Sequence, residues 1–436
     1  MKSIKVHINK LGLIRNADIE IKPLMLFSGY SGLGKSYVAI LCHYFFAVCV
    51  SDRRLNTYFK QVQESKGISF FDSEKRGKSM ASFTISKDEI EDWLAKDAVD
   101  YLRYMLGYPV FEADIKVEIP VSTDFSFQYE EEVIGLENNV EMYNKVSIWG
   151  GLSYRFKELG ITDESPYAIV FRFALIKILF GDWRSLNYCY VLPPARGMYM
   201  SEDSDMPMFS KAKTGLYQSF FSDMQELKAA IELPEKVSPD LIKTFKDVLS
   251  GEVKRDGGEY VYVTHGKTLP ISAAAASVRE IGPLQQLILK RDISKTSILI
   301  EEPESHLHPL KQIQMADIIA LMSKGGANMQ ITTHSDYFLR RLNDLIRLHI
   351  LKGKDERKYK ELCEEYGIPD LTLDSSILSA YYLEQAEEGG DVQIKRQDIT
   401  TGIPFDTFDS ANDKPLDLSV ILYELTNDSR DGESNC

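Results

Sequence analysis

Short apolar runs that end at glycine or at charged residues recur along the chain and predict buried strands. The clearest runs are residues 24–27, 297–300 and 329–333. The apolar stretch that begins at Tyr37 and the segment 310–322 predict helices between these strands. Strands that alternate with helices along the chain predict an α/β fold.

The segments between these runs have a more mixed pattern. Residues 51–186 alternate charge-rich helical stretches with strand-like pieces such as 115–119, residues 214–250 have apolar positions near helical spacing, and 259–271 predict a hairpin. The predicted organisation is a discontinuous core of 1–50 and 187–349, a mainly helical insertion of 51–186, and a C-terminal accessory region of 350–436 with a disordered tail from about 427.

The first candidate chemistry lies at residues 29–36, which read GYSGLGKS and fit Gly-x-x-x-x-Gly-Lys-Ser/Thr. A predicted strand precedes this segment and a predicted helix follows it, as a phosphate-binding loop requires. A chance glycine-rich turn is the alternative, and the complete pattern in its strand–helix frame argues against it. Backbone N–H groups and the helix N-terminus would hold phosphates, Lys35 would reach the β- and γ-phosphates, and Ser36 would bind Mg²⁺. The residues expected to form this phosphate site are Gly29, Ser31, Gly32, Gly34, Lys35 and Ser36.

Two further strand ends supply polar groups. The run 297–300 ends at Glu301 and Glu302, of which Glu301 is the candidate ligand for Mg²⁺ and Glu302 the candidate base for an attacking water. His334 follows the strand 329–333, where it can donate a hydrogen bond to a γ-phosphate. A solvated strand end and a structural histidine are the alternatives. The upstream Lys35 and the helix between the two strands favour the functional interpretation.

These motifs together resemble the signature set of ABC-type ATPases. The set comprises GYSGLGKS, then SILIEEPESHLHP, then ITTHSDYFL. The branch that it is most similar to contains stand-alone ATPases related to the overcoming-lysogenization-defect (OLD) proteins, which resemble RecF and SMC heads. Residues 4–14 resemble the antiparallel opening strands of that family, and 191–197 resemble its strand-Pro-Ala-Arg segment. The resemblance implies an ABC-type P-loop head that binds ATP and Mg²⁺.

The resemblance also implies a site completed by a second copy of the chain. Ser277 matches the signature serine that reaches the γ-phosphate of the other subunit, although Val278 stands where a glycine is usual. A capping box from Ser277 to Glu280 is a compatible local interpretation. The family's metal-binding aspartate is Glu301 here, which favours slow hydrolysis.

The family also implies two roles outside these strand ends. A glutamine contact to Mg²⁺ is expected after the first helix, and Gln61 and Gln63 both remain candidates. Residues 305–308, which include His306 and His308, are expected to line the seam between two subunits.

Composition limits the classes of protein. The chain has 436 residues, a formal net charge of −14 and 44% hydrophobic residues. No apolar run is long enough for a membrane span, and no secretory signal is evident. The five cysteines show no Cys-x-x-Cys pairing. Together these features predict a cytoplasmic protein with free thiols. The acidic balance argues against a uniformly basic nucleic-acid surface but leaves DNA binding through a local groove open. Candidates for such a groove are Lys211, Lys213, Lys243, Lys246, Lys254 and Arg255.

Missing motifs narrow the predicted function. Residues 340–436 contain no Asp-x-Asp and one histidine, His349, so neither a Toprim nor an HNH nuclease is expected there. The chain therefore resembles the ATPase subunit of a bacterial anti-phage defence complex that holds or activates a separate Toprim or HNH nuclease. The alternatives are a RecF/SMC-like DNA-repair ATPase and an ATP-binding scaffold with little hydrolysis.

Overall fold

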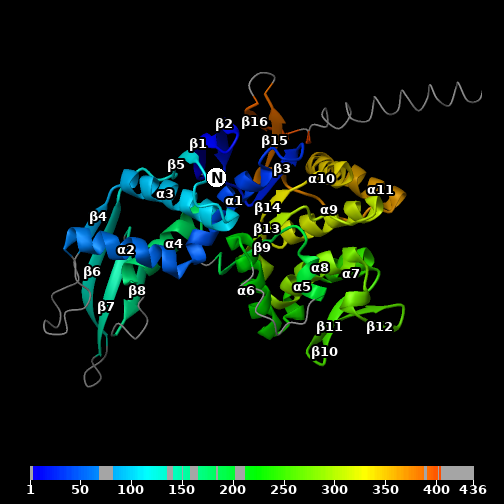
Figure 1. The fold of residues 1–436 in the computed structure, drawn as a ribbon, viewed down its shortest axis with the longest axis horizontal. Helices are drawn as coiled ribbons and strands as arrows, with labels where there is room; N and C mark the ends of the chain where they lie inside the picture. The colour runs from blue at the N-terminus through cyan, green and yellow to red at the C-terminus, as the bar shows by residue number, and fades with distance from the viewer. Residues whose placement is uncertain are drawn as a thin grey trace, which may run out of the picture.

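A nine-stranded mixed sheet forms the centre of the molecule (Figure 1). The structure is a computed structural model that describes residues 3–67, 82–134, 141–149, 151–157, 165–182, 185–201, 212–386, 390–400 and 402–403. The strands lie in the order β5 (Ala113–Glu118), β1 (Lys5–Leu11), β2 (Ile14–Glu20), β16 (Val392–Arg396), β15 (Leu378–Gln385), β3 (Leu24–Gly29), β14 (Asn328–Thr332), β13 (Thr296–Glu301) and β9 (Tyr188–Leu192). The expected α/β fold is confirmed.

The sheet has a parallel part and an antiparallel part. Strands β3, β14, β13 and β9 run parallel to their neighbours, while β15 pairs parallel with β3 and antiparallel with β16. Strands β5, β1 and β2 pair antiparallel, as expected for the opening strands. Parallel neighbours place their carboxyl ends at one edge, so the ends of β3, β14 and β13 lie side by side there.

Helix α1 (Lys35–Val50) packs against the parallel strands and is buried along nearly its whole length. Its far side packs against α3 (Lys87–Leu106) and α4 (Pro166–Phe180), so the sheet and these helices enclose it. This explains its continuous apolar sequence, because a helix covered on all sides needs no polar face. Helix α9 (Pro309–Lys324) connects β13 to β14 and packs on α10 (Asp336–Lys354), which α11 (Glu356–Tyr366) follows.

The described residues of 51–186 form helices and a second sheet, apart from β5 of the main sheet. The helices are α2 (Asp52–Lys66), α3 and α4, and the sheet has the order β4 (Phe83–Ile85), β6 (Phe125–Ile134), β7 (Glu141–Ile148) and β8 (Leu152–Phe156). An aromatic cluster joins helices to sheet, since Phe171 of α4 contacts both Phe59 of α2 and Phe125 of β6. The sheet is a difference from the mainly helical insertion that the sequence predicted.

The described residues of 197–295 form a smaller lobe beside β9. It contains α5 (Gly197–Ser201), α6 (Gly215–Ala229), α7 (Pro239–Leu249), α8 (Ala276–Lys290), β10 (Glu252–Asp256), β11 (Glu259–Thr264) and β12 (Lys267–Pro270). The expected hairpin is present as β11 and β12. The predicted helical stripe of 214–250 is broken between α6 and α7, where Ile231 is 83% exposed.

The topology also differs from the predicted division of the chain. Strand β5 comes from 51–186 but pairs with β1, and β15 and β16 come from 350–436 but lie within the main sheet. The C-terminal region therefore supplies core strands, and its description as accessory is wrong. The tail from 427 and Lys211 lie outside the described residues. The division into domains otherwise stays a prediction.

Candidate active site

The segment 29–36 forms a loop between the buried strand β3 and helix α1. Gly29, Gly32 and Gly34 have φ values of 128°, 81° and 91°, which side chains rarely adopt. Gly29 has a second constraint, because a Cβ atom there would lie 2.1 Å from the Leu383 carbonyl oxygen of β15. Gly32 and Ser31 are exposed at the outer side of the loop. The loop conformation therefore requires the glycines of the motif.

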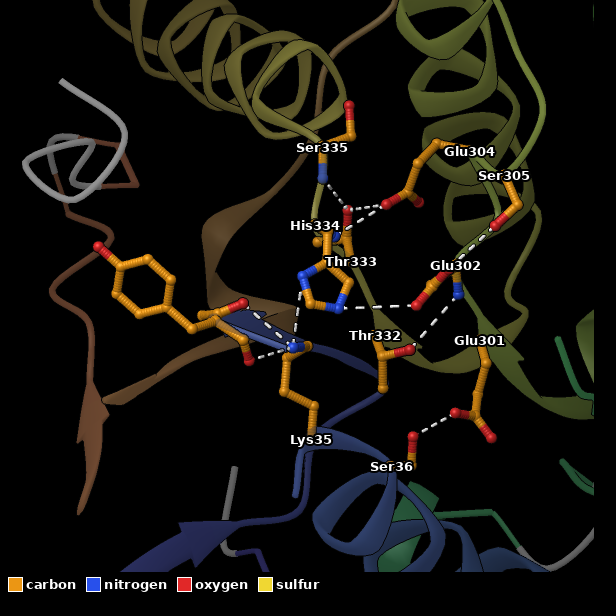
Figure 2. Close-up of polar contacts among 12 residues, drawn as sticks. Lys35, Ser36, Glu301, Glu302, Glu304, Ser305, Thr332, Thr333, His334 and Ser335 are labelled. Atoms are coloured by element: carbon orange, nitrogen blue, oxygen red, sulfur yellow. Dashed lines mark hydrogen bonds and ion pairs between the residues drawn. The ribbon is translucent and has the colours of Figure 1, made fainter. Parts of the chain in front are cut away.

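The Lys35 ammonium group lies against the same loop (Figure 2). Its Nζ donates to the carbonyl oxygens of Gly29 at 3.0 Å and Tyr30 at 2.8 Å, and lies 3.5 Å from Nδ1 of His334. Burial lowers the pKa of Lys35 to about 8, although nearby carboxylates, Glu302 first, oppose the shift. This cation faces the strand ends from inside the loop.

Ser36 reaches the acidic end of β13. Its hydroxyl donates to the carboxylate of Glu301, which is 5% exposed. Burial raises the pKa of Glu301, against the opposing hydrogen bond from Ser36. A hydroxyl and a carboxylate side by side are oxygen ligands that suit Mg²⁺, so this pair fits the expected metal.

Glu302 occupies a strained turn immediately after β13. Its φ of 46° is unusual for a residue with a side chain and costs about 1–3 kcal/mol. Its N–H donates to the Thr332 carbonyl oxygen at 3.0 Å, and its carboxylate accepts from the Ser305 hydroxyl at 3.1 Å. Its Oε1 lies 3.6 Å from Nε2 of His334 (Figure 2).

His334 lies between Glu302 and Lys35, after the end of β14. Burial, with the Lys35 charge, lowers the pKa of His334. The structure thus brings together Lys35, Ser36, Glu301, Glu302 and His334 from three neighbouring strand ends (Figure 2).

Glu304 is not among the predicted site residues, yet its carboxylate connects the end of β13 to the end of β14 through hydrogen bonds. It accepts the Thr333 hydroxyl at 2.7 Å and the His334 N–H at 2.9 Å, and it is 6% exposed (Figure 2). Burial raises the pKa of Glu304. The carboxylate thus fixes the backbone of His334. The sequence shows Glu304 only as a third acidic residue after Glu301 and Glu302, so this role becomes visible only in the fold.

Ser277 is the second residue of α8. Among the hydrogen bonds and ion pairs of the described residues, none joins Ser277 to Lys35, Glu302 or His334. The capping box expected there is wrong, because α8 begins at Ala276 and its N-cap Ala275 makes no side-chain cap. Glu280 is instead buried, with its carboxylate 3.9 Å from Nε of Arg196.

The glutamine candidates lie on α2. Gln61 is exposed, and Gln63 is buried with an Nε2 that lacks a hydrogen-bond partner. No contact in the described part of the chain joins either one to Ser36 or Glu301, so the choice between them stays open.

The histidines after the acidic turn have different local roles. His308 is the N-cap of α9 and accepts from the Leu310 N–H. His306 is exposed with a φ of 63°. The seam role of this loop stays a prediction.

The candidate basic groove is partly neutralised. Lys246 and Lys254 both pair with Glu252, and Arg255 donates to the carbonyl oxygens of Lys228 and Gly258.

Within the described ranges, no cluster of three or more His, Cys, Asp or Glu residues suited to a metal is present. The described helices include none long and apolar enough to cross a membrane.

Comparisons with known proteins give matches among solved structures. No family model matches the chain, and no curated protein matches it. Similar structures include an SMC head bound to the C-winged helix domain of ScpA, with 10% identity, coverage of 91% of this chain and 97% of that one, and a TM-score of 0.38. An SMC head domain from Thermotoga maritima has 11% identity, coverage of 92% and 100%, and a TM-score of 0.33. An SMC head with an extended coiled coil, bound to the C-terminal domain of ScpA derived from Pyrococcus furiosus, has 9% identity, coverage of 91% and 96%, and a TM-score of 0.35. At these values the likeness carries no argument about function, which rests on the chain's own site geometry.

Proposed function

We propose that this chain binds ATP with Mg²⁺ and hydrolyses the ATP slowly. The observation that carries the proposal is the meeting of Lys35 and Ser36 with Glu301, Glu302 and His334, across some 300 residues of chain. A lysine and backbone donors on one side, with carboxylates and an imidazole on the other, match the needs of phosphoryl transfer.

Each group has a distinct role in this proposal. Lys35 and the loop N–H groups would bind the β- and γ-phosphates, while Ser36 and Glu301 would hold Mg²⁺, which would offset the phosphate charge. Glu302 would accept a proton from the attacking water, and His334 would donate to the γ-phosphate. The longer side chain of Glu301, relative to aspartate, supports slow turnover.

Two substitutions test binding and hydrolysis separately. Lys35→Ala is expected to abolish ATP binding, measured by calorimetry with Mg²⁺, whereas the exposed Lys60→Ala is expected to bind as the wild type does. Glu302→Gln is expected to bind ATP but to lose about 10²–10⁴-fold in turnover. Undiminished affinity in Lys35→Ala would overturn the site, and wild-type turnover in Glu302→Gln would place the base elsewhere.

We also propose that the active unit is at least a dimer with ATP between the subunits. Ser277, the second residue of α8, would complete the site of the partner. Ser277→Arg and Lys35→Ala are each expected to be inactive alone. Their mixture should regain one composite site, made of the intact loop of the first and the intact Ser277 of the second. Full activity of Ser277→Arg as a monomer would contradict the sandwich.

The proposed biological role is an ATPase subunit of a bacterial anti-phage complex with a separate effector nuclease of the Toprim or HNH class. The motif resemblance to the OLD-like branch supports it, together with the lack of an Asp-x-Asp in 340–436. Co-purification with the product of a neighbouring gene, followed by mass measurement with and without ATP, tests the role. A DNA-repair partner instead of a nuclease would favour the RecF-like alternative, and an ATP-bound assembly without turnover would favour the scaffold.

A further inference from the structure

Arg196 is a buried cation whose hydrogen bonds all go to backbone carbonyl groups. It follows β9 and is 2% exposed. Its Nε donates to Glu280 O at 2.9 Å, its Nη1 to Pro193 O at 3.2 Å and Glu301 O at 2.8 Å, and its Nη2 to Glu302 O at 3.4 Å. The side chain therefore joins three separate segments of the chain.

Buried charges normally pair with carboxylates, and Arg196 has one such partner in the buried Glu280, at the outer limit of an ion pair. The carboxylate of Glu280 lies 3.9 Å from Nε, beyond hydrogen-bond distance, and its Oε2 has no hydrogen-bond partner. The planar fork of an arginine can hold several carbonyl oxygens in fixed directions, which a lysine ammonium cannot do. The geometry thus favours a positioning role over a simple ion pair.

The backbone that Arg196 holds is the strained turn of the site. Glu302 has a φ of 46°, its N–H is fixed by Thr332 O, and its carbonyl oxygen accepts from both Arg196 and the Ser305 N–H. With both adjacent peptide groups held, the Glu302 side chain is kept beside His334. Such strain persists only where the surroundings over-determine it.

Arg196 also binds the Glu280 carbonyl oxygen, which lies in the first turns of α8, the helix that carries Ser277. Gly197, next to Arg196, allows this approach, because a Cβ there would lie 2.9 Å from Glu280 Oε1 and 3.1 Å from Glu280 N. Arg196 therefore ties the acidic turn of its own site to the helix that would serve the partner's site.

We propose that Arg196 is a positioning residue for ATP hydrolysis, which holds the Glu302 turn in register with α8. This inference rests on the proposed function. Arg196 touches no nucleotide in this role, so its loss affects turnover and leaves the affinity for ATP in place. It acts through Glu302, so the two residues have non-additive effects.

The test is a double-mutant cycle with Arg196→Lys and Glu302→Gln, in which kcat, KM and the ATP dissociation constant are measured. Arg196→Lys is expected to lower kcat about 10–100-fold and to change the dissociation constant less than twofold. In the Glu302→Gln background it should lower kcat no further. Additive losses, or a loss confined to ATP affinity, would overturn the inference.

A control is Arg341→Lys, which alters a partly buried arginine, paired with Asp317 at 2.7 Å between α10 and α9. It is expected to lower the melting temperature with kcat unchanged. If Arg196→Lys fails to fold, as judged by its melting temperature and ATP affinity, Arg196→Gln replaces it, because its amide still donates two hydrogen bonds. A wild type without ATP turnover would refute the proposed function itself, whereas an active wild type with an additive cycle would refute only the role of Arg196.

Discussion

The two parts of the nine-stranded sheet bury their strands differently. Every residue of β13 and β14 is buried, whereas exposed and buried positions mix along β1, β2 and β5. Helices cover parallel strands on both faces. Polar groups along the buried length of these strands must therefore be paired with hydrogen-bond partners. The charged groups of the parallel part therefore gather at the strand ends, where the candidate site lies, while the antiparallel part carries charges along its strands.

Two histidines show the same contrast. His43 of α1 is 2% exposed and faces the parallel strands, where its Nδ1 lies 3.0 Å from Gln330 Oε1 of β14. His7 of β1 is partly exposed and lies 2.6 Å from Asp18 and 3.5 Å from Glu118. His43 must stay neutral to remain buried. His7 and its two carboxylate neighbours are in contact with water.

The largest effect is expected from Gly29→Ala, where the parallel part meets the phosphate loop. The φ of 128° and the approach of the Leu383 carbonyl oxygen together predict a loss of about 2–6 kcal/mol in the free energy of unfolding. Loss of ATP binding is expected as well. Urea unfolding and ATP calorimetry measure the two effects.

Gly67→Ala is the matched control, since Gly67 ends α2 with a φ of 66° and has open space around it. It should cost about 1–2 kcal/mol and leave ATP binding unchanged. Equal costs for Gly29→Ala and Gly67→Ala would show that β15 does not constrain the loop.

A smaller, pH-dependent effect is expected at His43. Burial lowers its pKa to about 4 from an ordinary value of 6.5, so the unfolded chain binds a proton in this range that the folded chain does not. Stability therefore falls as the pH drops from 6.5 toward 4, by about 3 kcal/mol from this group. The double variant His43→Leu/Gln330→Leu removes both polar partners and should lose this part of the pH dependence. Urea unfolding between pH 8 and pH 4.5 measures it, and an unchanged slope in the double variant would contradict the assignment.

The sequence could predict the parts of the site that local patterns encode. The loop, the acidic strand end and the strand before His334 each have a local signature, and parallel topology places such ends together. A pairing between distant segments has no local signature in the sequence. The sequence therefore did not predict that β15 pairs with β3 or that β5 pairs with β1.

The role of Glu304 and the bonds of Arg196 also depend on backbone directions set by a strained turn, which no residue pattern displays. The capping box is wrong because α8 begins at Ala276, so Ser277 lies inside the helix and not at its N-cap.

The smallest effect is expected at His7, in the antiparallel part. The side chains of His7, Asp18 and Glu118 are 41%, 82% and 53% exposed, so water and salt screen their attraction. Exposed pairs of this kind contribute roughly 0–1 kcal/mol. His7→Ala should therefore change the free energy of unfolding by less than about 1 kcal/mol at pH 7, and less still in 1 M salt, as urea unfolding at two ionic strengths would measure. A loss as large as that expected from His43 would mean that the antiparallel strands are as tightly covered as the parallel ones, and the contrast between the two parts of the sheet would fail.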